Sequence, residues 1–356
     1  MSHDRASCLV VLLFAACASD PPPPPGAPDA AATDAPAAVP VDGRGEIDAT
    51  EHLDAAALGG GHWEERAHLL EPNSECAVAE LDRHIYAIGG YPPDRVTVDT
   101  VQVYDVATGT WGLTTPLPQP LNHTVAAAAM GRLYVIGGQT DASTGSFVDD
   151  VYAYDPASES WSPRAPMPTA RSAAASAVIG DLIYVAGGRP PHGQDFAVYD
   201  AARDAWTALP PMPTGRNHLA VAAIDGLVYV AGGRFDAGFT SEATDTLELY
   251  DPATSTWSSR APMPTARGGV NGIAVGGCFY VWGGEHADGV WAENEVYHAA
   301  TNSWRSLAPL PIPVHGVTGA AFVDGWIYAP GGGTVQGGSS GSTYLQVFDT
   351  AGTCPM

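Results

Sequence analysis

The sequence contains no lysine, and its 15 cationic side chains are all arginines, against 39 aspartate and glutamate residues. With a formal net charge of −24, the chain lacks the basic character of proteins that bind nucleic acids or acidic membranes by charge. A G-x-S-x-G elbow, an H-E-x-x-H pair, a P-loop and a Cys-x-x-Cys pair are absent too. We therefore expect no nucleic-acid partner, no metal and no cofactor, and no catalytic motif identifies an enzyme.

Cysteine is scarce, with five residues in 356. Cys8 and Cys17 bound an apolar N-terminal run, which leaves Cys76, Cys278 and Cys354 for the rest of the chain. Three cysteines cannot all pair within one chain. Cys76 and Cys278 lie in apolar runs, so we expect buried thiols there, and their spacing fits no zinc motif.

The apolar run at residues 8–17 is too short to span a bilayer and has the small residues Ala15 and Ala16 before Cys17, which is typical of an export signal. It resembles a bacterial lipoprotein signal, which implies lipidation of Cys17 and, because Ala18 follows, an outer-membrane anchor facing the periplasm or the cell surface. Ordinary secretion and a chain that is not exported are the alternatives. Residues 18–60 are rich in proline, alanine and aspartate and poor in large apolar side chains, so we expect a disordered tether.

Glycine is abundant, and six Gly-Gly pairs divide residues 61–356 into repeats of 45 to 51 residues. Units of this size bury too little apolar surface alone and must stack on their neighbours. The pairs begin at Gly89, Gly137, Gly187, Gly232, Gly283 and Gly331, and each follows a tyrosine by three residues.

Each repeat has the pattern of a four-stranded antiparallel sheet: a run of small residues, a turn, a Tyr-containing run that ends in Gly-Gly, a loop, and an aromatic residue followed seven positions later by tryptophan. Five repeats keep that last spacing, the first from Tyr104 to Trp111. The alanine-rich first runs suit strands crowded around an axis, and the tyrosines and tryptophans can fill the space between sheets.

These motifs resemble the kelch family of β-propellers over residues 62–356. The resemblance implies an all-β, six-bladed propeller and, for many members, a role as an interaction platform. Trp63 precedes the first repeat, whereas no tryptophan follows Asp349 in the last. We therefore expect a strand within residues 62–67 to complete the last blade and close the ring.

Arginine and histidine concentrate at one side of the predicted blades. The position sixteen residues before each Gly-Gly pair holds Asn73, Leu121, Arg171, Arg216, Arg267 and His315, while Arg189 and Arg234 directly follow their pairs. Because hairpin geometry places both positions on one face, these residues are ligand-binding candidates, together with Asn217, His218 and His123. Guanidinium groups suit carboxylate or phosphate recognition. Alternatively, the arginines are struts between blades, paired with acids on the same face such as Asp99, Asp149, Asp195, Asp245, Glu285 and Glu293.

Three functions follow as hypotheses. The first is a monomeric binding module that takes a protein, an acidic peptide, a glycan or a small anionic ligand at an Arg/His-lined channel mouth. The second is a sugar mutarotase or epimerase, because the chain resembles an exported sialic-acid mutarotase in blade number and compartment; Glu285 with Arg216 or Arg267 is then the candidate acid/base set. The third is a passive structural or adhesive surface protein.

Overall fold

The computed structural model describes residues 60–142, 146–337 and 340–354. The predicted export signal at residues 1–17, with Cys17, and nearly all of the predicted tether at 18–60 lie outside these ranges. Within the described ranges every regular element is a β-strand. No helix long and apolar enough to span a membrane occurs there.

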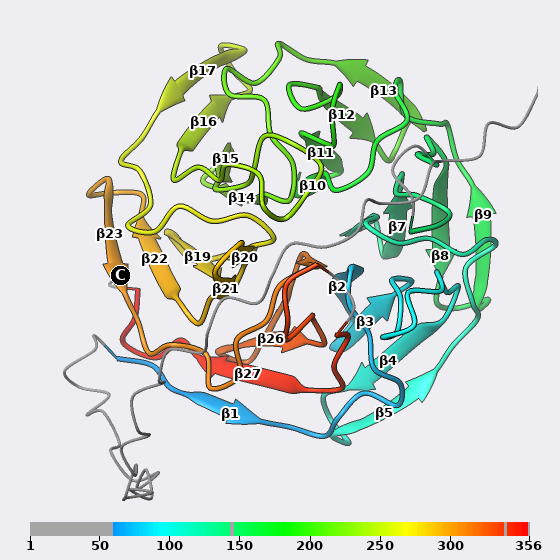
Figure 1. Cartoon of the computed structure of the whole chain (residues 1–356). Helices are drawn as coiled ribbons and strands as arrows, with labels where there is room; N and C mark the ends of the chain where they lie inside the picture. Colours follow the sequence, from blue (N-terminus) through cyan, green and yellow to red (C-terminus); the bar gives the residue numbers. More distant parts are fainter. Residues whose placement is uncertain (1–59, 143–145, 338–339, 355–356) are drawn as a thin grey trace, which may run out of the picture. The chain divides into compact units, whose positions relative to one another are not determined.

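Six sheets surround a central axis, as Figure 1 shows in a view along that axis, and this confirms the predicted six-bladed propeller. Blade one consists of β2 (Cys76–Leu81), β3 (His84–Ile88), β4 (Val101–Asp105) and β5 (Thr110–Leu113). Blade two consists of β6 (Val125–Ala129), β7 (Arg132–Ile136), β8 (Val151–Asp155) and β9 (Ser160–Pro163). Blade three consists of β10 (Ala175–Ile179), β11 (Leu182–Ala186), β12 (Phe196–Asp200) and β13 (Ala205–Ala208).

Blades four and five repeat the same antiparallel order. They consist of β14 (Ala220–Ile224), β15 (Leu227–Ala231), β16 (Leu247–Asp251) and β17 (Thr256–Ser259), and of β18 (Asn271–Val275), β19 (Cys278–Trp282), β22 (Asn294–His298) and β23 (Ser303–Ser306). The loop between β19 and β22 carries a short hairpin of β20 (Glu285–His286) and β21 (Gly289–Val290).

The last blade joins both ends of the described chain, as predicted. It consists of β25 (Ala321–Val323), β26 (Trp326–Pro330), β27 (Leu345–Asp349) and β1 (Trp63–Glu65), and β1 pairs antiparallel with β27 beside it in Figure 1. A further short strand, β24 (Val317–Thr318), pairs in parallel with β2 of blade one. The sheet that would otherwise end at β27 is therefore completed by the first described strand.

Aromatic pairs recur at equal places within the blades, and the tryptophan of each pair is hydrogen-bonded to the preceding blade. Tyr104 and Trp111 face each other across β4 and β5 with ring centroids 5.3 Å apart, and Trp63 and Phe348 repeat this pairing across β1 and β27 at 5.0 Å. The indole N–H group of each tryptophan donates to a backbone carbonyl that follows the last strand of the preceding blade. Trp63 Nε1, for example, donates to Ala308 O at 2.9 Å. Six apolar clusters, one at each blade boundary, form the core.

A closed ring of backbone hydrogen bonds surrounds the axis just before the first strand of each blade. Each residue of the ring donates its N–H to the carbonyl of the ring residue in the preceding blade, with His123 N to Glu75 O at 2.8 Å as one link. Every member has a positive φ, an uncommon conformation for the four that are not glycine. The six members are Glu75, His123, Ala173, His218, Gly269 and Gly316.

One sequence-based expectation is wrong. Cys278 is not a buried thiol but forms a disulfide with Cys354, which ties the segment after β27 to blade five. Cys354 lies so close to the C-terminus that no strand pattern placed it near Cys278. Cys76 is a buried free thiol, as expected.

Candidate functional site

Three of the candidate arginines serve their own blades rather than an open surface. Arg171, Arg216 and Arg267 are fully buried. The Arg216 guanidinium donates to the carbonyls of Gly232, Val230 and Thr214 and pairs with Glu248 Oε2 at 2.6 Å. For Arg216 the geometry favours the strut alternative, although the strut lies within its blade and uses Glu248, which was not among the acids expected. Arg234 of blade four does pair with Glu285 of blade five at 2.6 Å, which is a strut between blades with one of the expected acids.

Arg267 and Arg171 repeat this arrangement with one difference. Arg267 pairs with Glu295 Oε2 at 2.6 Å and donates to three carbonyls of blade five. Arg171 Nη1 instead reaches the carbonyls of Val185, Gly187 and Asp195. Burial lowers the pKa of Arg171 to about 10. All three guanidinium groups bind the backbone around the end of the second strand, the place that Asn73 Nδ2 takes in blade one with Gly89 O.

The count of sixteen residues does not hold in the last blade. Gly284 N donates to Val314 O, as Gly233 N donates to Arg267 O, so Val314 takes the arginine position and His315 lies one residue beyond it. His315 is still buried at the axis side, where it is 2 % exposed.

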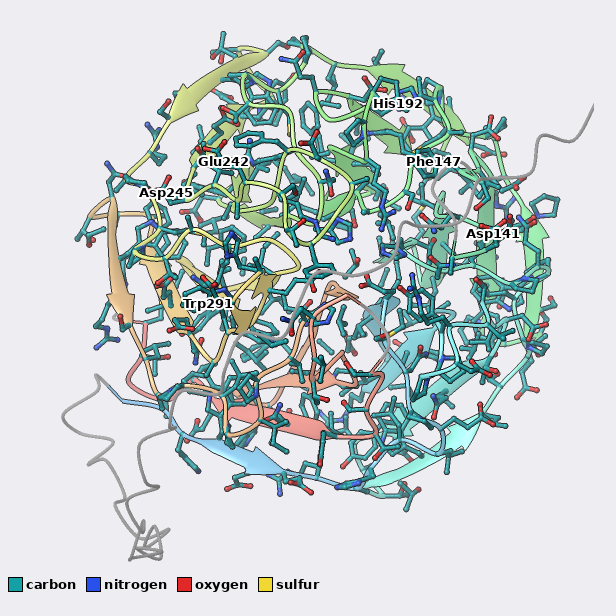
Figure 2. The ribbon with its side chains drawn as sticks, in the orientation of Figure 1. Asp141, Phe147, His192, Glu242, Asp245 and Trp291 are labelled. Carbon is teal, nitrogen blue, oxygen red and sulfur yellow. A yellow bond between two sulfur atoms is a disulfide. The ribbon has the colours of Figure 1, made fainter. Side chains whose placement is uncertain are left out.

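Seven buried side chains, here called the mouth cluster, meet where the loops of different blades surround the axis. The arc of such loops is marked in Figure 2 by Asp141, His192, Glu242 and Trp291. The structure thus brings together five of the candidates from the sequence, His123, Arg189, His218, Arg234 and His315, along with Glu285. The mouth cluster consists of Glu75, His123, Arg189, His218, Arg234, Glu285 and His315.

Glu75 is the member that sequence reasoning missed. It stands fourteen residues before its Gly-Gly pair, as do His123 and His218 in blades two and four. All three belong to the ring of backbone hydrogen bonds, so their side chains leave the backbone at equivalent places. A comparison of the residues fourteen positions before each Gly-Gly pair would have placed Glu75 in the same set as the two histidines.

The two carboxyl groups of the mouth cluster have opposed acidity. Burial raises the pKa of Glu75 above its ordinary value of 4.5, and the charge of Glu285 adds to the shift. Burial also opposes ionisation of Glu285, but His315 and Arg234 outweigh it and lower the pKa of Glu285 below 4.5. Arg234 Nη1 donates to Glu285 Oε1 at 2.6 Å, and Gly337 N donates to Oε2 at 2.7 Å.

Two histidines of the mouth cluster, His123 and His218, are neutral, and each is fixed in one tautomer. Burial is the main cause that lowers the pKa of His123 and His218 well below 6.5, and the nearby arginines lower it further. Each Nδ1 donates to the Oδ1 of the preceding asparagine at 2.5 Å, Asn122 for His123 and Asn217 for His218. Asn217 is therefore a positioning residue, and both Nε2 atoms carry a lone pair.

Arg189 differs from the other buried arginines. Its Nη2 donates to His123 Nε2 at 2.9 Å, and that Nε2 lies 3.1 Å from Glu75 Oε2. Within the described ranges neither Arg189 nor Arg171 forms a carboxylate ion pair, whereas Arg234, Arg216 and Arg267 each do. Arg171 donates to three backbone carbonyls instead, whereas the guanidinium of Arg189 donates to His123. The buried Nε atoms of Arg189 and Arg234 and Nε2 of His218 have no hydrogen-bond partner among the same residues.

A cavity of about 210 Å³ adjoins these groups. Glu75, His123, Arg189, Arg234 and Glu285 line it. Tyr91, Arg95 and Phe239 add an aromatic and cationic wall. The arrangement can hold an anionic group against buried N–H donors, beside one carboxyl group whose pKa is raised and one whose pKa is lowered.

Comparisons with known proteins agree with the repeats. A family model described as the KLHDC2/KLHL20/DRC7 Kelch-repeats domain matches residues 67–233, and the Kelch motif matches residues 215–264. Kelch repeat and BTB domain-containing protein 13 of Homo sapiens is 40% identical over 76 residues, which are 21% of this chain and 16% of that protein.

An F-box/kelch-repeat protein of Arabidopsis thaliana is 33% identical over 84 residues, which are 24% of this chain and 22% of that protein. The chain thus spans less than a quarter of the length of these relatives. The solved structure of YjhT superposes with a TM-score of 0.66 at 16% identity and covers 79% of this chain and 96% of its own. The chain carries kelch repeats, and these repeats build its six-bladed β-propeller.

Proposed function

We propose that the protein is a binding module and that the mouth cluster receives an acidic group of its ligand. Kelch propellers are generally protein-interaction modules. The observation that carries the proposal is Arg189, a 7 % exposed cation that has no carboxylate partner within the described ranges. A buried charge without a counter-ion is costly, and a ligand carboxylate or phosphate would supply one.

The charges around Arg189 favour an anion over a cation. Arg234 neutralises Glu285, the raised pKa of Glu75 favours its uncharged form, and His123 and His218 are neutral imidazoles. The positive charge of Arg189 is therefore left over. The Nε–H groups of Arg189 and Arg234 are available as donors to the same incoming group.

The size of the cavity limits what enters it. Sites for drug-sized ligands measure about 300–1,000 Å³, whereas this cavity measures about 210 Å³. A single aspartate or glutamate side chain of a peptide, or a small organic acid, matches that volume. We therefore propose an acidic peptide or a small carboxylate as the ligand.

A thermal-shift and titration-calorimetry screen of the full chain tests this function. The panel contains organic acids, acidic sugars and acidic peptides, with neutral glycans and amidated peptides as controls. A ligand at about 100 times its Kd stabilises the fold by about 2.7 kcal/mol. The shift should disappear in Arg189→Gln and remain in Arg203→Gln, whose side chain is 80% exposed. Equal binding by both variants would refute the role of the mouth cluster.

A second candidate function is proton transfer on an acidic sugar, which the carboxyl pair favours. A neutral acid and an ionised base at one cavity are the arrangement of acid–base catalysts. Glu75 and Glu285 would form this set, because Arg216 and Arg267, named with Glu285 from the sequence, are occupied within their blades. Faster anomer exchange by NMR, lost in Glu75→Gln and in Glu285→Gln, would support it, and an unchanged rate across acidic and neutral sugars would remove it.

We also propose that the protein is exported and anchored through a lipid at Cys17. The disulfide between Cys278 and Cys354 supports an oxidising compartment. Cell fractionation checks the anchor: Cys17→Ser should move the protein from the membrane fraction to the soluble fraction. If Cys17→Ser fractionates like the native chain, ordinary secretion or retention in the cell remains as the alternative. A passive surface role predicts a different result, namely that variants of the mouth cluster behave like the native chain.

A further inference from the structure

A second cluster of chemically active side chains lies at the outer part of blade five, apart from the mouth cluster. Cys278 of β19 and His298 of β22 are direct partners across the two strands. His298 Nδ1 lies 3.2 Å from Cys278 Sγ, and Cys354 reaches the same place from the segment after β27. The two sulfur atoms and a ring nitrogen of His298 all lie within 4.8 Å of one another.

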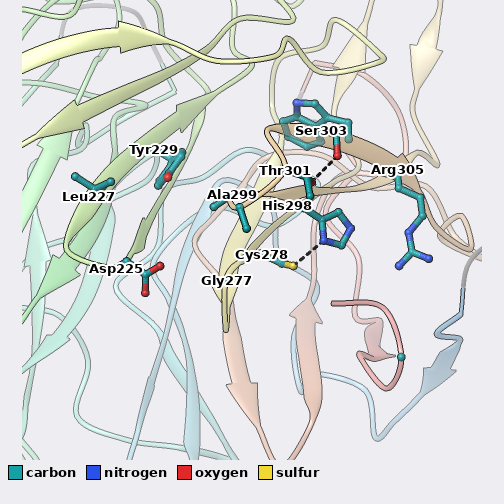
Figure 3. A pocket seen from close by; sticks show the side chains of 13 residues that line it. Asp225, Leu227, Tyr229, Gly277, Cys278, His298, Ala299, Thr301, Ser303 and Arg305 are labelled. Atoms are coloured by element: carbon teal, nitrogen blue, oxygen red, sulfur yellow. Dashed lines mark hydrogen bonds between the residues drawn. The ribbon is translucent and has the colours of Figure 1, made fainter. Parts of the chain in front are cut away.

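Cys278 and His298 of this cluster line a cavity of about 780 Å³ (Figure 3). Leu227, Tyr229 and Trp304 provide its apolar side, while Asp225, His298 and Arg305 are its charged or titratable members. None of the mouth cluster residues lines it. A small reagent or a metal ion can therefore reach Cys278 and His298 without passing the axis of the propeller.

We propose that Cys278, Cys354 and His298 form a binding site for a soft divalent metal such as Zn²⁺ once the disulfide is reduced. Two thiolates and one imidazole are a known zinc ligand set, and it leaves a fourth position for water or another ligand. Cys278 and His298 both line the cavity, from which such a ligand would come. The site is independent of the proposed function of the mouth cluster.

The chemistry needs a reductant, and a dithiol or a phosphine would supply the two electrons. The two electrons break the sulfur–sulfur bond between Cys278 and Cys354 and give two thiols. A dithiol that supplies the electrons becomes a cyclic disulfide. Metal binding then releases two protons, one from each thiol, so that M²⁺ and two thiolates form an uncharged unit with neutral His298.

Contacts other than the disulfide keep Cys354 near the site after reduction. Thr353 Oγ1 lies 2.6 Å from the Tyr280 hydroxyl, and Arg305 Nη2 donates to Thr353 O at 2.6 Å. The residue next to Cys354 is thus held to β19 and β23 by two hydrogen bonds. Only a short terminal segment has to adjust when the sulfur atoms separate to bind a metal.

Cobalt(II) titration of the full chain tests the proposal, because Co²⁺ occupies zinc sites and gives a thiolate-to-metal absorption band. The chain is reduced with a phosphine, freed of reductant without oxygen, and compared with the oxidised chain. We expect about one Co²⁺ bound with this band in the reduced chain, none in the oxidised chain, and displacement by Zn²⁺. His298→Ala should weaken the affinity by at least about tenfold.

The Cys278→Ser/Cys354→Ser variant is the matched control, because it keeps Cys8, Cys17 and Cys76. Loss of the band in it assigns the signal to the pair, and Cys354→Ser alone gives the same answer if the double variant fails to fold. Two results would overturn the proposal. One is a reduced chain whose thiol count shows an open disulfide but which has no cobalt band, and the other is a band that persists in the serine variants.

Discussion

Arginine has two distinct uses in this protein. Arg216 and Arg267 each bind a carboxylate and three carbonyls of one blade, so every donor that points into the blade has a partner. Arg189 instead lies at a cavity with an unpartnered Nε among the described residues. The first use fixes the fold, whereas the second leaves a charge for a ligand.

Replacement of a strut arginine should therefore lower the free energy of unfolding. Arg216→Ala leaves Glu248 buried without its cation and frees three buried carbonyls, so we expect the free energy of unfolding to fall by about 3–5 kcal/mol. Arg203→Ala, at an 80% exposed side chain, should change it by no more than about 0.5 kcal/mol. Urea unfolding curves measure both. Equal losses would mean that the buried pair is not a strut.

Acid should destabilise the protein through its neutral histidines. The folded-state pKa of His123 and His218 lies below 6.5, so the unfolded chain binds more protons as pH falls from 6.5 toward the lowered value. The stabilising contribution of each histidine is complete above pH 6.5 and is lost as the pH falls. Within the window each histidine lowers the free energy of unfolding by about 1.4 kcal/mol per pH unit. Glu75, whose pKa is raised, acts in the opposite direction between 4.5 and its folded value.

His218→Gln isolates one of these contributions. Because glutamine does not titrate, unfolding curves between pH 7 and pH 5 should give a shallower slope for the variant than for the native chain. If the two slopes coincide, His218 is not held neutral by its surroundings.

At the scale of elements, β1 is the strand that completes the ring. Trp63 stacks on Phe348 and donates to Ala308 O, so it joins β27 to blade five. Trp63→Ala should cost about 2–4 kcal/mol, reduced from the value for a fully buried aromatic residue because Trp63 is half-buried.

Hydrogen exchange locates that loss. In Trp63→Ala the amides of β27 should exchange faster, while those of β11 in blade three keep their protection, because β27 is the strand that β1 pairs with in the sheet. Unchanged exchange in β27 would show that β1 does not close the propeller.

The fold could be predicted from the sequence because six repeats of one pattern indicate the same succession of strands. The spacing from Tyr104 to Trp111 recurs since both residues face each other across one strand pair, and Trp63 marks the missing strand. The site was predicted in part. The column of His123 and His218 was visible, but the sequence does not show which guanidinium turns into its blade, as Arg216 does, and which meets a neighbouring blade, as Arg189 does.

Two other features escaped the sequence for physical reasons. One extra residue in the last repeat shifts His315 from the arginine position, because loop lengths can change without disturbing the strands. The pairing of Cys278 with Cys354 depends on the path of the chain after β27, where no repeated pattern remains.

At the scale of the whole molecule, an acidic propeller buries five of its arginines. The chain carries a net charge of −24, yet Arg171, Arg189, Arg216, Arg234 and Arg267 are all buried. A closed ring of backbone hydrogen bonds and six aromatic pairs fix the blades around the axis. Residues from all six blades therefore meet in the mouth cluster at fixed positions, which suits recognition of one small acidic group.

The most direct test is a crystal of the full chain soaked in bromide at pH 7, because bromide is a simple anion that anomalous scattering locates without knowledge of the natural ligand. The account predicts an ordered bromide at the mouth cluster within hydrogen-bond distance of a donor nitrogen of Arg189, and its loss in Arg189→Gln. Bromide found on the outer surface but absent from the mouth cluster would contradict the claim that this cluster is an anion site.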